Sequence, residues 1–321
     1  MTLPLVVLNG PTASGKSGLA IELALELGRG GQPAEIVNAD SMLVYRGMDI
    51  GTAKPSPQEL ALVPHHLVDV AELTEQASVA DFQRAAREVI AALRSRGVLP
   101  VLVGGSALYV HAILDDFSFP STDPRLRARW EAELGRVGAR ALHAVLAERD
   151  PAVAAGIEPG NGRRTVRALE VLELDGGFSS QLPQWRYALD EVHQFGLTLP
   201  REVMDERINQ RVDQMWADGL VAEVRRLEER GLRQGVTASR ALGYRQVLQF
   251  LDGEFGEAEA AQRVKGGTRR FARKQLSWFR RDPRITWLDA GPPAATASLV
   301  AAVLQRLGPV LSGPGGPAVT R

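Results

Sequence analysis

The strongest chemical signal in the sequence is a glycine-rich loop near its start, Gly10-Pro11-Thr12-Ala13-Ser14-Gly15-Lys16-Ser17. It matches the G-x-x-x-x-G-K-[S/T] pattern of the P-loop, with which ATP-binding and other nucleotide-binding proteins hold phosphates. The glycines let main-chain N–H groups point inward at phosphate oxygens, and the N-terminus of the following helix adds positive potential. Lys16 supplies a point charge and Ser17 a hydroxyl that can ligate Mg²⁺. The loop predicts a site for a diphosphate or polyphosphate, with Mg²⁺ as cofactor.

Two further polar segments follow apolar strand patterns. The strand predicted for 35–37 runs into Asp40, and the one predicted for 99–103 ends at the turn Gly104-Gly105-Ser106. A nucleotide hydrolase usually has a second apolar strand that ends in an aspartate for the metal, and here the strand at 99–103 ends in glycines instead. Asp40 is therefore open to three interpretations: a metal ligand, a general base, or a loop residue that caps a helix.

The elements that must position these residues alternate between strand and helix patterns. Strands are expected at 3–8, 35–37, 99–103 and, more weakly, 66–70. Helix-length segments separate them, which predicts an α/β fold with a doubly wound parallel sheet of the P-loop NTPase type. Beyond the sheet, apolar residues at helical spacing predict one long amphipathic helix over 204–227.

The pattern becomes helical between about residues 121 and 190, and 192–199 then returns the chain to the sheet. This change predicts an all-helical domain inserted into the α/β core. The expected organisation is therefore a first part of the P-loop core at 1–120, the helical insertion at 121–190, core completion with basic C-terminal helices at 191–310, and a flexible Gly/Pro-rich tail at 311–321.

The composition is that of an ordinary globular chain, with 321 residues of which 45% are hydrophobic and 24% charged. It excludes disordered, collagen-like and repeat-dominated classes. The sequence has neither an apolar run long enough to cross a membrane nor the pattern of a signal peptide. Cysteine is absent, which excludes disulfides, Cys-ligated zinc and a Cys nucleophile. These features predict a cytoplasmic protein without a membrane partner.

A formal net charge of zero, with 38 basic and 38 acidic residues, hides a strongly basic segment. Between Arg263 and Arg284 there are nine bases and a single acid, Asp282. Local charge density governs affinity for phosphates, so this segment predicts contacts with nucleic acid, the alternative being a solvated helix face. His65 and His66 lack a second His or Cys pair at ligand spacing, which favours a packed loop over a metal site.

Several segments together resemble the tRNA dimethylallyltransferase family, also called tRNA isopentenyltransferases. Besides the P-loop they are NADSMLVYRGMDIGTAKP (38–55), HHLVDV (65–70), SVADF (78–82), VGGSALY (103–109), RTVRALEV (164–171), RALGYRQ (240–246) and FARKQLSWFR (271–280). The P-loop alone is unspecific, but the combination of 38–55 with 240–246 is very specific. The segments follow the family's order over most of the chain.

The resemblance implies transfer of a dimethylallyl group from dimethylallyl diphosphate to N6 of the adenosine on the 3′ side of a tRNA anticodon. The products would be N6-isopentenyladenosine and diphosphate. Asp40 matches the family's general base, and Ser106 stands where the family usually has Thr and would hold the target base or Asp40. Arg211, with Lys16 and with Mg²⁺ held partly by Ser17, would stabilise the leaving diphosphate. The resemblance also favours a monomer.

The resemblance further implies contacts with the tRNA anticodon stem-loop. The matching positions are Asp40, Ser41, Met42, Leu43, Ser106, Arg127, Arg163, Arg164, Thr165, Val166, Arg167, Arg240, Ala241, Leu242, Gly243, Tyr244 and Arg245. The basic segment resembles the family's C-terminal helix and is expected to add phosphate contacts. Its aromatic and apolar residues Phe271, Leu276, Trp278 and Phe279 are expected to pack in the core rather than stack on bases.

Three other functions remain as alternatives. A P-loop small-molecule kinase would consume ATP, whereas prenyl transfer needs no nucleoside triphosphate. A relative that prenylates free AMP, ADP or ATP would share the P-loop, but RALGYRQ, the helical insertion and the basic segment favour a polymeric acceptor. A non-catalytic RNA-binding protein would leave the P-loop unexplained.

Overall fold

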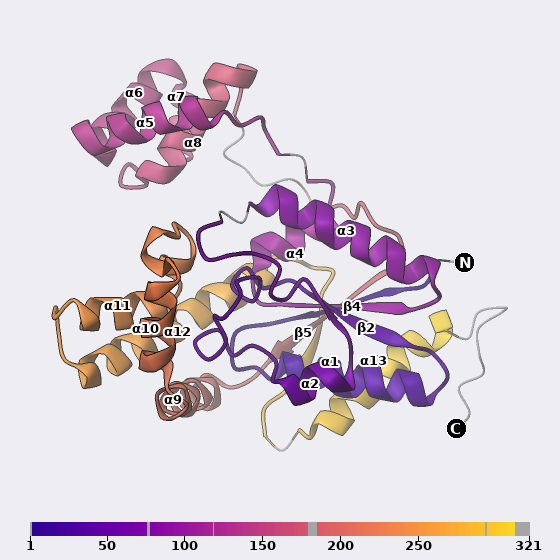
Figure 1. Cartoon of the computed structure of the whole chain (residues 1–321). Helices are drawn as coiled ribbons and strands as arrows, with labels where there is room; N and C mark the ends of the chain where they lie inside the picture. Colours follow the sequence, from indigo (N-terminus) through magenta and orange to yellow (C-terminus); the bar gives the residue numbers. More distant parts are fainter. Residues whose placement is uncertain (1, 76–77, 118, 179–184, 293, 312–321) are drawn as a thin grey trace. The chain divides into compact units, whose positions relative to one another are not determined.

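A computed structural model describes residues 2–75, 78–117, 119–178, 185–292 and 294–311 (Figure 1). The chain forms two compact units. The core unit consists of Met1–Leu114 and Tyr187–Arg321, and the inserted unit of Asp115–Arg186. The sequence pattern predicts this insertion at 121–190. Apart from Leu311, the expected tail lies outside the described residues.

The described residues of the core unit form a six-stranded sheet in the order β3-β2-β4-β1-β5-β6. Every neighbouring pair of strands is parallel. The strands are β1 (Leu5–Asn9), β2 (Ala34–Asn38), β3 (His65–His66), β4 (Leu99–Gly104), β5 (Val192–Thr198) and β6 (Thr286–Asp289). This sheet confirms the predicted α/β class.

The weak strand expected at 66–70 is only partly present. β3 ends at His66, because Leu67 and Asp69 adopt left-handed backbone angles with φ of 62° and 55°. Such angles are incompatible with an extended strand. The last strand, β6, is not among the predicted strands. It has only four residues and comes soon after the basic segment 263–284, so its short apolar run gives no separate strand pattern.

Helices cover both faces of the sheet (Figure 1). They are α1 (Lys16–Arg29), α3 (Val79–Ser95), α4 (Ala107–Leu114) and α13 (Thr296–Leu311). Leu5 and Val7 of β1 belong to the core formed with α3 and α4. Val6 and Leu8 belong to the core formed with α1 and α13. Successive side chains of β1 therefore point to opposite helical layers, as a doubly wound sheet requires.

The core unit contains further helices, some of which border the site described below. These elements are α2 (Pro57–Leu62), α9 (Arg201–Ala217), α10 (Leu220–Glu229), α11 (Tyr244–Leu251), α12 (Glu257–Phe279) and the 3₁₀ turns Leu232–Gln234 and Ala238–Arg240. The single helix predicted over 204–227 is wrong. Gly219, with φ of 95°, separates α9 from α10, and only glycine adopts such an angle without strain.

The inserted unit is a small helical bundle with its own core. It contains α5 (Pro124–Val137), α6 (Ala139–Arg149), α7 (Pro151–Ala155) and α8 (Gly162–Asp175). Leu142 and Leu146 of α6 pack with Ala168 and Leu169 of α8, all four fully buried. Across the described residues of both units, the structure contains no helix with the length and apolar character to cross a membrane.

Gly104, at the end of β4, offers a test of how tightly the sheet edge beside the site is packed. A Cβ at Gly104 would lie 2.6 Å from the carbonyl oxygen of Ala39, the residue that follows the neighbouring strand β2. We expect Gly104→Ala to lower the free energy of unfolding by about 1–3 kcal/mol, because main-chain atoms must move to admit the methyl group. Chemical denaturation measures this change.

Gly28→Ala in α1 is the matched control. An added Cβ there meets nothing within 4 Å, so the substitution should be neutral or stabilising. Equal stability of the Gly104→Ala protein and the wild type would contradict the packing described here.

Candidate active site

The P-loop connects β1 to α1 and curls around its own lysine. Gly15 caps the helix in a left-handed conformation with φ of 92°, and Ala13 also has a positive φ, 62°. The Lys16 ammonium donates to the carbonyl oxygen of Pro11 at 2.6 Å. This conformation places Lys16 and Ser17 at the start of α1, where the helix dipole adds positive potential.

The loop borders a cavity of about 780 Å³ within the core unit. The cavity lies at the carboxyl ends of β1, β2 and β4, which is where open parallel sheets bind ligands. Its walls include P-loop residues, the segment after β2, the turn after β4, and residues of α9 and α12. Among them are Thr12, Lys16, Ser17, Asp40, Ser41, Met42, Leu43, Ser106, Arg207, Arg211, Phe271 and Gln275.

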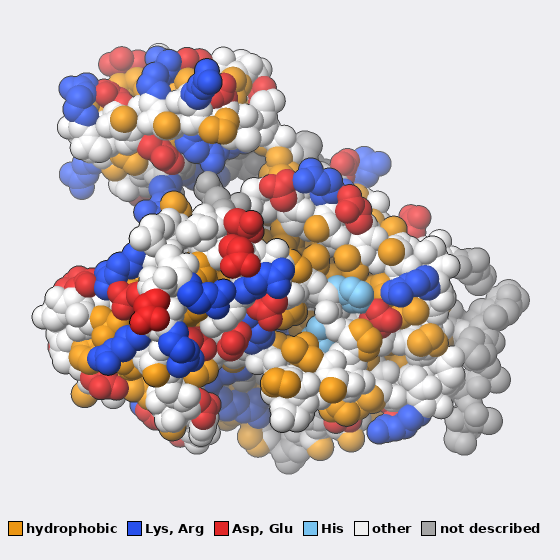
Figure 2. Space-filling model, viewed as in Figure 1, with side chains coloured by type: hydrophobic (Ala, Val, Ile, Leu, Met, Phe, Trp, Pro, Cys, Tyr) orange, Lys and Arg blue, Asp and Glu red, His pale blue; other side chains and the backbone are white. Residues whose placement is uncertain are grey.

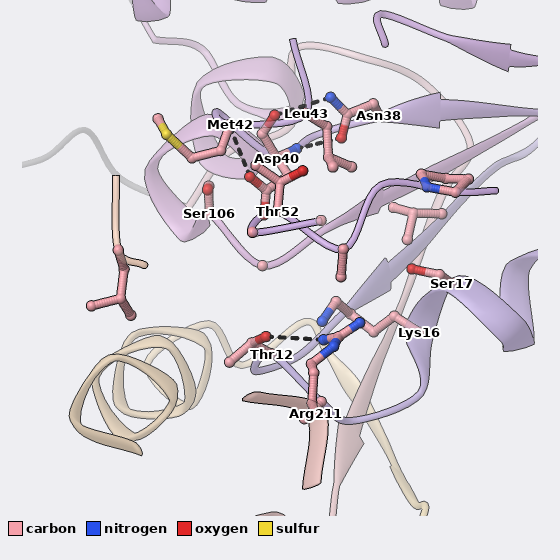
Figure 3. A pocket seen from close by; sticks show the side chains of 18 of the residues that line it. Thr12, Lys16, Ser17, Asn38, Asp40, Met42, Leu43, Thr52, Ser106 and Arg211 are labelled. Atoms are coloured by element: carbon pink, nitrogen blue, oxygen red, sulfur yellow. Dashed lines mark hydrogen bonds between the residues drawn. The ribbon is translucent and has the colours of Figure 1, made fainter. Parts of the chain in front are cut away.

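Asp40 and the cationic side chains lie on different sides of this cavity (Figure 3). The main-chain N–H of Asp40 donates to Asn38 Oδ1 at 2.7 Å, and Asn38 Nδ2 donates back to the Asp40 carbonyl oxygen at 3.0 Å. The N–H of Met42 donates to Asp40 Oδ1 at 2.9 Å. Asp40 thus occupies a turn, and the next described helix begins only at Pro57. The interpretation of Asp40 as a helix cap is therefore wrong.

Burial shifts the protonation of all three charged groups. It raises the pKa of Asp40, against the opposing effects of the Met42 N–H, Lys16 and Arg211. It lowers the pKa of Lys16 to about 8, an effect that Asp40 opposes and Arg211 strengthens. It also lowers the pKa of Arg211, again opposed by Asp40. The cavity therefore combines a carboxylate of increased basicity with cations whose charge is poorly solvated.

Arg211 reaches the P-loop from α9. Its Nη1 donates to Thr12 Oγ1 at 3.3 Å, which joins two segments far apart in the sequence. Arg207, one helical turn earlier, lines the same cavity and donates to the carbonyl oxygen of Ala290 at 3.5 Å. Two arginines of one helix face therefore border the space next to Lys16, which suits a highly charged anion.

The residues present fit a magnesium ion bound together with a diphosphate. Mg²⁺ in such sites takes few protein ligands and completes its octahedron with phosphate oxygens and water. The Ser17 side chain lines the cavity at the start of α1 (Figure 3). In the described part of the chain, no group of three or more His, Cys, Asp or Glu residues could hold a metal by itself.

The two histidines of β3 bind protein atoms. His65 Nδ1 lies 2.8 Å from the carbonyl oxygen of Val63, and His66 Nε2 lies 2.6 Å from Glu35 Oε2. These contacts agree with a packed segment.

Gln275 of α12 makes two contacts that sequence analysis missed. Its Oε1 accepts a hydrogen bond from the Thr12 N–H at 2.9 Å, and its Nε2 donates to the Gly105 carbonyl oxygen at 2.8 Å. The residue is only 4% exposed. One side chain thus connects the P-loop to the turn that carries Ser106.

The segment Arg240–Arg245 divides into cavity-lining and buried parts. Arg240, Ala241, Leu242 and Gly243 line the cavity, and Arg245 is exposed. Tyr244 is different: its side chain is fully buried in the core and does not line the cavity, so the contact with tRNA expected at this position stays a prediction. A tyrosine ring on the apolar face of α11 packs, even though its neighbours are accessible.

The buried Tyr244 hydroxyl binds Glu223, a second residue whose role no sequence pattern indicated. It donates to Glu223 Oε1 at 2.6 Å, and Glu223 also accepts from the N–H groups of Asp49, Ile50 and Gly51 at 3.3, 2.8 and 3.3 Å. Glu223 is 2% exposed, so these donors replace its hydration. The carboxylate fixes the loop at 49–51, and Gly51 lines the cavity.

Several basic side chains of the segment 263–284 contact neighbouring side chains, and some of them form ion pairs. Lys265 pairs with Asp213 at 2.6 Å, Arg269 donates to Asn209 at 2.6 Å, and Arg284 pairs with Asp282 at 2.7 Å. Exposed positions remain at Arg270, Lys274, Arg280 and Arg281. Figure 2 likewise shows basic and acidic side chains intermixed over the helical region of the core unit.

Phe271 departs from the prediction that the aromatic residues of this segment pack in the core. Phe279 is buried as expected, but Phe271 is 45% exposed and lines the cavity. Phe271 shares the cavity-facing side of α12 with Thr268 and Gln275. An exposed aromatic ring at this position provides a surface on which a base can stack.

In the inserted unit, two of the predicted tRNA-binding residues contact a buried acid, Glu170, that no sequence pattern revealed. Arg127 and Arg167 both bind Glu170, at 2.7 and 2.8 Å, and Glu170 is fully buried. Burial acts to raise the pKa of Glu170, but hydrogen bonds from Thr122, Arg167 and Arg127 outweigh it and lower the pKa to about 2. Both arginines therefore have a structural partner.

The remaining predicted positions of α8 differ in exposure. Arg163 and Arg164 are exposed, whereas Thr165 and Val166 are 0% and 3% exposed. The Thr165 hydroxyl donates to the carbonyl oxygen of Asn161 at 3.1 Å. The side chains of Thr165 and Val166 are thus buried in the bundle, and the tRNA contacts expected at these two positions stay predictions.

Fold and cavity together define an α/β protein with a P-loop-like core. A family model described as IPP transferase matches residues 43–282. The tRNA dimethylallyltransferase of Kineococcus radiotolerans is 59% identical over 312 residues, covering 97% of this chain and 98% of the relative. That of Cutibacterium acnes is 54% identical over 307 residues, covering 96% of each.

Solved structures agree. The tRNA isopentenylpyrophosphate transferase of Bacillus halodurans is 39% identical with a TM-score of 0.70, covering 95% of this chain and 96% of its own. A eukaryotic dimethylallyltransferase acting on tRNA has a TM-score of 0.75 at 23% identity, covering 96% and 80%, and supports the fold alone. The chain belongs to the IPP transferase family, the enzymes named tRNA dimethylallyltransferases, which confirms the resemblance seen in the sequence.

The lowered pKa of Lys16 predicts how anion binding depends on pH. Between pH 7 and 9 the affinity for inorganic pyrophosphate should fall by about tenfold or more, because Lys16 loses its proton as the pH rises through about 8 and a charged hydrogen bond is lost. Isothermal titration calorimetry measures the affinity.

Lys16→Arg is the control, because arginine stays protonated over this range. The ionisation of pyrophosphate itself affects both proteins equally, so their difference isolates Lys16. The same pH dependence in both proteins would rule out Lys16 as the titrating group.

Proposed function

We propose that this chain transfers a dimethylallyl group from dimethylallyl diphosphate to N6 of the adenosine 3′-adjacent to the tRNA anticodon, giving N6-isopentenyladenosine and diphosphate. Family membership supports dimethylallyl transfer to tRNA. The single observation that carries the chemistry is one cavity in which Asp40 and the Lys16–Arg211 pair lie on different sides. A base and a site for an anionic leaving group are thereby available to one substrate pair.

The P-loop end of the cavity holds the donor. Main-chain N–H groups of the loop, Lys16 and Arg211 bind the diphosphate, and their fixed charge stabilises the negative charge that grows as the carbon–oxygen bond breaks. Mg²⁺ held partly by the Ser17 hydroxyl supplies further positive charge to the diphosphate oxygens. Because the cations are poorly solvated before the donor binds, they do not need to lose water during the reaction.

The opposite wall activates the acceptor. The exocyclic amine of adenine is a weak nucleophile, and Asp40 accepts its proton as the bond from N6 to the allylic carbon forms. The Met42 N–H holds Asp40 Oδ1, which orients the carboxylate so that its second oxygen can take the proton. The raised pKa of Asp40 makes it a stronger base than an exposed aspartate. Ser106, on the same side of the cavity in Figure 3, holds the base or Asp40.

The acceptor is a polymer whose target base must leave its stack to enter the cavity. Phe271 offers an aromatic surface at the cavity, and Arg240 also lines it. Exposed basic side chains of α12, together with Arg163 and Arg164 of the inserted unit, bind backbone phosphates of the anticodon stem-loop. We further propose that the enzyme acts as a monomer in the cytoplasm.

Replacing the general base tests the reaction. Asp40→Asn should lower kcat by about 10²–10⁴, because the amide cannot accept the amine proton, while the affinity for tRNA changes only a few-fold. Mass spectrometry of tRNA nucleosides after incubation with dimethylallyl diphosphate and Mg²⁺, without ATP, detects the product. A folded wild-type protein that forms no isopentenyladenosine under these conditions but consumes ATP would contradict the proposal and favour a kinase.

The exposed bases of α12 test the RNA surface. Changing Arg270 and Lys274 together to alanine should weaken tRNA binding and reduce the slope of log K against log salt by about 1.5, since each phosphate contact contributes about 0.7–0.9. Filter binding at several salt concentrations measures the slope. The control changes Arg29 and Arg84, which are exposed on α1 and α3 and pair locally with Glu26 and Asp81. An equal slope for both double variants would exclude α12 from the interface.

A further inference from the structure

We propose that Gln275 is a positioning residue that fixes the diphosphate-binding loop from helix α12. This inference rests on the proposed function, because it takes the P-loop as the site of the donor's diphosphate. Gln275 differs from the residues that bind substrate: its amide contacts main-chain groups of the protein, and it acts on the substrate only through them.

The chemistry of the two partners requires an amide at this position. The Thr12 N–H can only donate and the Gly105 carbonyl oxygen can only accept, so the side chain between them must present one acceptor and one donor. Glutamate provides the acceptor but places a carboxylate oxygen against the Gly105 oxygen. Leucine provides neither group, and at 4% exposure water has little access to replace it.

Thr12 is the residue on which two helices converge. Its N–H binds Gln275 of α12 and its hydroxyl accepts from Arg211 of α9, at 2.9 and 3.3 Å. The P-loop must keep a fixed curvature for its N–H groups to converge on phosphate oxygens. Loss of the Gln275 contact frees the third residue of this loop, and with it the partner of Arg211.

Gly105 shows that the amide and the turn after β4 fit each other closely. A Cβ at Gly105 would lie 2.5 Å from Gln275 Nε2, so only glycine leaves room for the amide. The next residue is Ser106, which lines the acceptor side of the cavity. Gln275 therefore sets the spacing between the donor end and the acceptor end of the site.

The position of Gln275 on α12 gives the contact a further consequence. The side of the helix that lines the cavity carries Val264, Thr268, Phe271 and Gln275. The exposed Lys274 immediately precedes Gln275 in the sequence. The helix proposed to bind the RNA backbone is thus the one that holds the loop for the donor.

Direct binding of inorganic pyrophosphate with Mg²⁺ tests the inference without requiring turnover. We expect Gln275→Leu and Gln275→Glu each to weaken pyrophosphate binding by about tenfold or more and to raise the KM for dimethylallyl diphosphate, while the KM for tRNA changes less than twofold. Gln262→Leu makes the same chemical change at an exposed position of the same helix and should bind like the wild type. Circular dichroism verifies that each protein is folded.

The outcomes separate the inference from the proposed function. Wild-type pyrophosphate affinity in both folded Gln275 variants overturns the inference, as does an equal rise in both KM values, which a general loss of structure would produce. If Lys16→Ala leaves pyrophosphate binding unchanged, the proposed donor site itself fails, whatever the Gln275 variants do.

Gly105→Ala reaches the same contact from the other side and remains available if Gln275→Leu fails to fold. The added methyl group displaces the amide, so Gly105→Ala alone should weaken pyrophosphate binding about as much as Gln275→Ala. In the double variant the two effects should not add, because both remove one interaction. Fully additive losses overturn the inference.

Discussion

The site depends on keeping three charges poorly solvated in one cavity. Lys16 and Arg211 lie near the phosphate loop, and Asp40 lies on another wall. Burial lowers the pKa of Lys16 and of Arg211 and raises the pKa of Asp40, so it favours the neutral form of each group. Such charges are costly unless they are paired. The protein holds them apart with main-chain hydrogen bonds around Asp40 and with Thr12 beside Arg211. Under the proposed function, a bound diphosphate supplies the counter-charge that Lys16 and Arg211 lack.

The parts of the fold and the site that depend on local sequence could be predicted. A strand followed by its own polar turn is visible without a structure, and three such units gave the P-loop, Asp40 and the turn at Gly104-Gly105-Ser106. Parallel strands bring their carboxyl ends to one edge of a sheet, so the convergence of these turns on one cavity follows from the predicted α/β class. Arg211 came only from the family resemblance, because an arginine on an amphipathic helix does not indicate which element it faces.

The parts that depend on distant partners could not be predicted. Gln275 binds residues 263 and 170 positions earlier, and no local pattern distinguishes it from a solvated glutamine. Tyr244 and Phe271 show the same limit in opposite directions: the first was expected at the surface and is buried, the second was expected in the core and borders the cavity. Helical periodicity identifies an apolar side, but which side meets a cavity depends on how the helices pack. The roles of the buried residues Glu223 and Glu170 could not be predicted for the same reason.

The way the chain enters and leaves the inserted unit has a consequence for how the enzyme can vary. The N–H of Ala188 binds the carbonyl oxygen of Leu114 at 2.8 Å, and the N–H of Asp116 binds that of Arg186 at 2.9 Å. The segment that enters the inserted unit and the segment that leaves it are thus joined by main-chain hydrogen bonds on both sides of the unit boundary. With respect to the core unit, the inserted unit is a loop whose two ends are held together by these hydrogen bonds. The entropic cost of closing such a loop grows only slowly with the number of residues in it. The bundle can therefore lengthen, shorten or change its surface during evolution while the catalytic sheet keeps its connections.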